Sequence, residues 1–139
     1  MKKKITLHSS FDIPDHGIGF STSLVDYRLA WEVNQKINIH LVKLSDKIFH
    51  ERKTGKEVEL SVYYFKTGES GKLFIIKLKY EGISIIPGLK NFDYVLISDY
   101  SEEEIKQLFS ELTGMNIHGG CFLIKLNENW KTVLRKIIY

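Results

Sequence analysis

The sequence predicts an α+β domain, with a mostly antiparallel sheet and two to three helices packed on one face. Three observations predict this class. Apolar and polar residues alternate with a period of two over the middle of the chain, two segments carry the signals of a helix start, and short turns join the expected strands. A strictly alternating parallel fold would need more helices than the sequence offers. Because the 139 residues show no internal repeat and no linker, we expect a single domain over residues 1–139.

The first predicted helix follows Ser23 and runs to about Ile37. Ser23 stands three residues before Asp26, which is the spacing of a capping box. At about 100° per residue, polar side chains such as Arg28 and Glu32 fall on a narrow sector, and apolar side chains occupy most of the remainder. We therefore expect this helix to be buried on more than one side.

A second helix is predicted to begin at Ser101, with Glu104 in the capping-box position. Its apolar side chains repeat at the spacing of one helix face, and Gly114 is placed to end it. The residues of that face are Ile105, Leu108, Phe109 and Leu112. Asn127 is a candidate cap for a last short helix that carries Trp130. We expect the helix that begins at Ser101 to pack on the core through one face only.

Strands are predicted between and around these helices. Two long runs with a period of two, at 57–64 and 74–80, form a predicted hairpin around the turn at 66–71. Pro87 and Gly88 stop the strand that precedes them. The remaining expected strands are 83–86, 93–98 and 120–126, with shorter candidates at 3–7 and 39–44.

Composition restricts the class of protein. The chain is 43% hydrophobic, 12% aromatic and 27% charged, as an ordinary globular domain is. A single cysteine, Cys121, leaves no partner for an intramolecular disulfide, and it favours a cytoplasmic location. The cysteine stands in an apolar run, which predicts core packing. We expect neither export nor a membrane span, because no run approaches the ~18 apolar residues that a span needs.

No motif indicates catalysis, and we expect no catalytic, cofactor-binding or metal-binding residue. The five histidines do not stand at metal-ligand spacings, and no phosphate-binding or nucleophile motif occurs. The densest polar patch is formed by Asp12, Asp15 and His16. These side chains could gather around a cation or a proton, or they could belong to an irregular turn.

Two stretches, 26–39 and 86–97, resemble the signature regions of the bacterial family named IPExxxVDY. The spacing from Pro87 to Asp93 and Tyr94 is similar to that pattern, with Gly88 in place of its Glu and Phe92 in place of its Val. The resemblance implies a small soluble protein of Bacteroidetes-type bacteria. It brings no catalytic residue with it.

The shared residues also predict a site where the two stretches meet. We expect Trp31 to pack near Tyr94, and Arg28 to lie close to Asp93. Such a corner serves either as a structural motif or as a contact site. The candidate contact residues are Asp26, Tyr27, Arg28, Trp31, Pro87, Asn91, Asp93 and Tyr94.

The leading hypothesis is a non-enzymatic domain that contacts another protein or a second copy of itself, as in a homodimer. It rests on several large apolar residues near helix faces and the end of the chain, which exceed what a small domain must expose. These residues are Trp31, Trp130, Ile137, Ile138 and Tyr139.

The alternative hypothesis is an RNA-binding domain that uses a basic sheet face. Lys77 and Lys79 share one face of a predicted strand, and Tyr63 and Phe65 are expected opposite them. Nucleic acid is not the favoured partner, because the net charge of +3 comes from 20 basic against 17 acidic residues and is not concentrated. An enzyme is the third reading, and it would require a deep pocket with converging polar groups.

Overall fold

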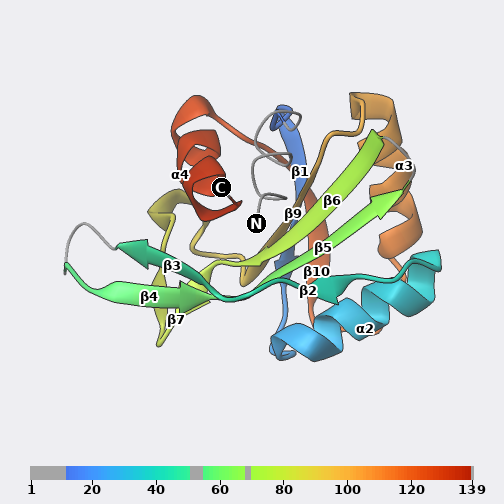
Figure 1. The fold of residues 1–139 in the computed structure, drawn as a ribbon. Coiled ribbons are helices and arrows are strands. Elements are labelled where there is room, and N and C mark those ends of the chain that lie inside the picture. The colour runs from blue at the N-terminus through green and yellow to red at the C-terminus, as the bar shows by residue number, and fades with distance from the viewer. Residues whose placement is uncertain (1–11, 51–54, 68–69, 139) are drawn as a thin grey trace.

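The computed structural model describes residues 12–50, 55–67 and 70–138 (Figure 1). Six strands form an antiparallel sheet in the order β10-β1-β9-β6-β5-β2, and two pairs of short strands form the small sheets β3-β4 and β7-β8. The helices are α2 (Asp26–Ile37), α3 (Glu102–Leu112) and α4 (Glu128–Ile138), with a short 3-10 helix η1 (Pro87–Leu89). The strands are β1 (His16–Ser21), β2 (Val42–Lys43), β3 (Lys47–His50), β4 (Glu57–Leu60), β5 (Val62–Thr67), β6 (Ser70–Lys77), β7 (Lys79–Tyr80), β8 (Ile83–Ser84), β9 (Tyr94–Ser98) and β10 (Gly120–Lys125).

Strand β9 lies in the middle of the large sheet, and all five of its residues are buried. Because side chains alternate along a strand, Val95 and Ile97 join one apolar cluster and Leu96 joins another on the opposite face. We call these clusters the first core and the second core. The register places Leu96 beside Ile18 of β1 and Ile75 of β6, which also belong to the second core. The sheet is therefore buried on both faces.

The helices divide between the two faces. Side chains of α2 and α3 pack in the second core, whereas Leu134 and Ile137 of α4 pack in the first core. In Figure 1, α4 lies on the opposite side of the large sheet from α2 and α3. The α+β class and the antiparallel sheet are confirmed, but the expectation that all helices share one face is wrong. The reason is that the central strands carry apolar side chains on both faces, so each face needs a cover.

The two long strands of the predicted hairpin are each interrupted, at Ser61 and at Leu78. The Leu78 N–H donates to the carbonyl of Asp93 at 2.9 Å, and the Leu78 side chain is fully buried in the first core. Beyond the interruption, β4 pairs with β3 instead of continuing the large sheet. Val58 and Leu60 of β4 then pack in the first core with α4. The predicted strands at 39–44 and 83–86 shorten to β2 and β8, and the candidate at 3–7 lies outside the described residues.

The predicted capping box of α3 is confirmed. The Ser101 hydroxyl accepts from the Glu104 N–H at 3.2 Å, and the Glu104 carboxylate accepts from the Ser101 N–H at 2.8 Å. The predicted box at Ser23 is wrong, because α2 begins at Asp26 with Val25 as its cap and without a side-chain cap. The cap of α4 is confirmed, since the Asn127 side chain accepts from the Trp130 N–H at 2.8 Å.

None of the helices in the described part of the chain has the length and the apolar character that crossing a membrane requires.

Candidate interaction surface

Helix α2 carries an exposed aromatic stripe on the side that faces away from the sheet. Tyr27 and Trp31 stand one turn apart and are 69% and 49% exposed. The Arg28 guanidinium lies 4.8 Å from the centre of the Trp31 ring, and it pairs with the Glu32 carboxylate at 3.0 Å. Val25, at the cap, is also exposed. We call Val25, Tyr27, Arg28 and Trp31 the α2 surface.

The spacing of the apolar residues explains why this stripe is exposed. Leu29, Ala30 and Val33 are the buried residues of α2, and they occupy one face of the helix. Trp31 stands two residues after Leu29, so it points about 200° away around the helix axis. The expectation that α2 is buried on more than one side is therefore wrong, because only one side of the helix contacts the sheet.

The stretch 86–97 is hydrogen-bonded to the segment directly before α2 and not to the stretch 26–39 itself, although Leu29 and Tyr94 belong to the same core. The Tyr94 hydroxyl donates to the Leu24 carbonyl at 2.8 Å, and the Asp93 carboxylate accepts from the Thr22 N–H at 2.8 Å. Burial raises the pKa of Tyr94, and the neighbouring carboxylates of Asp26 and Asp93 raise it further. Tyr94 therefore keeps its proton and serves as a hydrogen-bond donor that joins β9 to the start of α2.

The specific contacts predicted at this corner do not form. Arg28 pairs with Glu32 of its own helix, and Asp93 pairs with Lys79 at 3.1 Å. Trp31 lies outside the second core, which contains Tyr94. The physical reason is the orientation of α2, which turns Arg28 and Trp31 toward solvent and only its Leu29 face toward the sheet.

Asp26 anchors the start of α2. Burial alone would raise the pKa of Asp26, but hydrogen bonds from the Ser61 side chain and the Tyr27 N–H, together with the charge of Lys43, lower it overall. The Lys43 ammonium lies 3.8 Å from the carboxylate. This candidate residue is thus occupied by contacts to β2 and to the segment between β4 and β5.

Pro87 begins η1, and Gly88 lies directly beneath the Trp130 ring. A Cβ atom at position 88 would stand 2.6 Å from the Trp130 Cζ2 atom. This packing accounts for glycine at the position where the resembling family has Glu, because a side chain would displace the indole. Asn91 is exposed in the turn after η1.

Most of the large apolar residues expected on the surface are not there. Ile137 is 1% exposed and Ile138 is also buried, and Trp130 packs against the first core. Tyr139 lies outside the described residues. Their burial follows from α4, whose inner side forms part of the first core. Trp31 is the member of that predicted group which the structure exposes.

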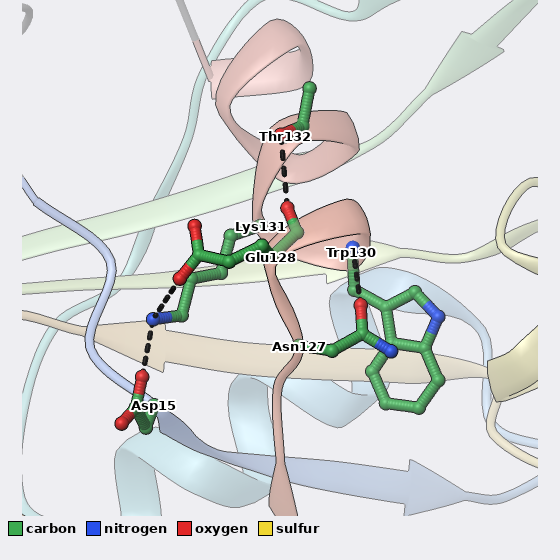
Figure 2. A network of polar contacts seen from close by, with 6 residues as sticks. All are labelled: Asp15, Asn127, Glu128, Trp130, Lys131 and Thr132. Atoms are coloured by element: carbon green, nitrogen blue, oxygen red, sulfur yellow. Dashed lines mark hydrogen bonds and ion pairs between the residues drawn. The ribbon is translucent and has the colours of Figure 1, made fainter.

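Asp15 belongs to an ion-pair network with α4, as Figure 2 shows. The Lys131 ammonium donates to the Asp15 carboxylate and lies 3.4 Å from the Glu128 carboxylate. The hydrogen bond from Lys131, followed by its charge, lowers the pKa of Asp15, and the same hydrogen bond raises the pKa of Lys131.

Within the described ranges, no group of three His, Cys, Asp or Glu side chains could hold a metal ion. Sequence reasoning missed Lys131; the signal was its place one turn before Leu134, on the apolar side of α4.

The aromatic platform of the RNA-binding hypothesis is not on the surface. Tyr63 is 8% exposed and belongs to the second core, against which Phe65 also packs. Helices α2 and α3 cover that sheet face, so bases have no access to these rings. Lys79 is engaged in the ion pair with Asp93.

Cys121 packs against the second core and is half-buried. Burial raises the pKa of its thiol, which keeps the sulfur protonated and weakly nucleophilic. The predicted packing role of this residue agrees with its place in β10.

No family model matches the chain, and no curated protein matches it. Membership of the IPExxxVDY family stays a prediction from the stretches 26–39 and 86–97.

Proposed function

We propose that this chain is a non-enzymatic protein-interaction domain that binds another protein, or a second copy of itself, through the α2 surface. The observation that carries the proposal is the exposed pair Tyr27 and Trp31 on one helix stripe, with Arg28 stacked on the indole. We further propose a cytoplasmic location, on the basis of the single cysteine.

The chemistry of the α2 surface supports this role. Trp, Tyr and Arg are the residue types enriched among the side chains that dominate binding energy at protein interfaces. The stacked contact and the ion pair with Glu32 hold Arg28 near the indole. The Arg28 side chain therefore loses less conformational entropy when a partner binds. Tyr27 and Trp31 would bury large rings on association, because 69% of Tyr27 and 49% of Trp31 are exposed.

The proposal is tested with the Trp31→Ala variant. Removing an interface tryptophan costs about 2 kcal/mol or more, so we expect affinity for the partner to fall by about 30-fold or more. Capture of proteins from a cell lysate on the immobilised full chain, followed by mass spectrometry, measures binding to another protein. Light scattering after size exclusion, at tens of micromolar chain, measures self-association.

The matched control is Phe122→Ala. Phe122 is an aromatic residue of β10 that is also 49% exposed, but it packs beside Phe92 and not on α2. We expect this variant to retain the partner, or the dimer mass, that Trp31→Ala loses. Retention of the same proteins and the same mass by both variants would refute the α2 surface as the contact.

A further inference from the structure

A groove lies between the C-terminal end of α2, the end of β9 and helix α3, with a cavity volume of about 570 Å³. Apolar side chains form part of its lining: Ile37 at the end of α2, Tyr100 after β9 and Leu108 of α3. These residues belong to the second core or pack against it. The groove is separate from the aromatic stripe, which lies on the N-terminal half of α2.

Carboxylates surround this apolar lining. Glu103 and Glu111 stand two turns apart on one stripe of α3, with Gln107 between them, and they are exposed. Asp99 and Glu104 complete the acidic set. The residues that line the groove in the described part of the chain include no lysine or arginine. The groove is thus acidic although the whole chain carries a net charge of +3.

Two of these carboxylates are held in place by the backbone. The Asp99 carboxylate accepts from the Lys72 N–H at 2.9 Å, and the Glu104 carboxylate accepts from the Ser101 N–H at 2.8 Å. Tyr100 lies between them in the chain, and the pKa of its phenol is raised. Burial is the largest cause, and the charges of Asp99, Glu104 and Glu111 raise the pKa further.

We propose that this groove binds a basic, amphipathic peptide segment of a partner protein. Apolar side chains of the segment contact Ile37, Tyr100 and Leu108, and its lysine or arginine side chains pair with Glu103 and Glu111. The stripe from Glu103 to Glu111 is about 12 Å long, which matches three or four residues of an extended peptide. The inference rests on the proposed function and deepens it. It adds a second contact surface and specifies that the partner segment is basic and amphipathic.

The test is a titration of the full chain against a fluorescein-labelled peptide that alternates lysine with leucine, measured by fluorescence anisotropy. We expect saturable binding that weakens as salt is raised from 20 to 150 mM, because the screening length of the solution falls from about 20 to about 8 Å. The double variant Glu103→Gln and Glu111→Gln should bind about tenfold more weakly, since each exposed ion pair contributes about threefold to the affinity.

The matched control is Glu102→Gln. It removes one carboxylate charge from the same helix, but Glu102 does not line this groove and pairs with Lys106 at 2.9 Å. We expect its affinity for the peptide to stay within twofold of the unmodified chain. In the NMR spectrum, the side-chain amide signal of Gln107 should shift on titration, because this amide lies between the two glutamates.

Four results would overturn the proposal. These are no binding of the peptide at 20 mM salt, equal binding by the double variant, equally tight binding of tri-lysine, and equally tight binding of a peptide that alternates glutamate with leucine. The Trp31→Ala variant should bind the lysine–leucine peptide like the unmodified chain. Failure of the groove is thereby distinguished from failure of the α2 surface, which is tested with other residues.

Discussion

Gly119 lies where the chain leading into β10 crosses the end of β1. A Cβ atom at position 119 would overlap the backbone oxygen of Ser21 and stand 3.2 Å from the Thr22 Cα atom. The Thr22 hydroxyl donates to the Ile117 carbonyl, which holds the same two segments together. Because these neighbours are backbone atoms and cannot rotate away, the crossing requires glycine.

The first prediction concerns Gly119→Ala. We expect it to lower the free energy of unfolding by about 1–3 kcal/mol, as overpacking against a rigid neighbour does. The control is Gly114→Ala, whose Cβ atom would meet the mobile end of Lys36 at 3.3 Å. It should change the free energy by less than about 1 kcal/mol. Urea denaturation of both variants measures the difference, and equal losses would contradict the prediction.

Helices α2 and α3 begin in different ways although their sequences look alike. Ser101 and Glu104 satisfy each other's free N–H groups at the start of α3. At α2 the segment before the helix is used for tertiary contacts instead. The Thr22 N–H donates to Asp93, and the Leu24 carbonyl accepts from Tyr94. Those long-range bonds delay the first helical turn, so Ser23 is left outside it.

The second prediction compares the two serines. Ser101→Ala removes a side-chain cap and should lower the free energy of unfolding by about 1 kcal/mol. Ser23→Ala should change it by less than about 0.5 kcal/mol, because Ser23 is exposed and caps nothing. Thermal unfolding followed by circular dichroism measures both. A loss at Ser23 as large as that at Ser101 would show that α2 begins earlier than described.

At the scale of the whole molecule, α4 closes the first core and is tied to the start of β1 by Lys131. The buried Lys131 ammonium contacts the carboxylates of Asp15 and Glu128 (Figure 2). The Asp15 carbonyl also accepts from the Leu126 N–H at 2.6 Å, beside the last residues of β10. One lysine thus connects two ends of the described chain that are 116 residues apart.

The third prediction is a pH dependence carried by this pair. The pKa of Asp15 is lowered in the folded state, so its contribution to stability is present above the ordinary pKa of about 4 and is lost as the pH falls below it. We therefore expect Lys131→Met to lower the free energy of unfolding by more at pH 7 than at pH 2.5.

Lys136→Met is the control for that comparison, because Lys136 lies exposed on the same helix. Its difference from the unmodified chain should be the same at both pH values. Chemical denaturation at pH 7 and pH 2.5 measures both variants. If Lys131→Met lowers the free energy of unfolding equally at both pH values, the ion pair with Asp15 does not contribute to the stability of the fold.

Local patterns predicted the parts of this fold that depend on neighbours in the chain. The capping box at Ser101 and the cap at Asn127 involve groups three residues apart, and their hydrogen bonds form as the spacing indicates. The period of two indicated β4 to β7 for the same reason, but it did not predict β1 or β3. Where the run is interrupted at Leu78, the Leu78 N–H bonds to the Asp93 carbonyl of a distant segment, and the period cannot show such a partner.

The candidate site was predicted in composition but not in geometry. Tyr27, Arg28 and Trp31 of the α2 surface were named from the sequence and Val25 was not. The predicted contacts of Arg28 with Asp93 and of Trp31 with Tyr94 do not form. Helical periodicity shows which residues share a face, because it follows from the local backbone. It does not show which face meets the sheet when α2 is apolar on most of its circumference. That choice, like the pairing of Asp15 with Lys131, depends on contacts between distant segments, and such contacts exist only after the chain has folded.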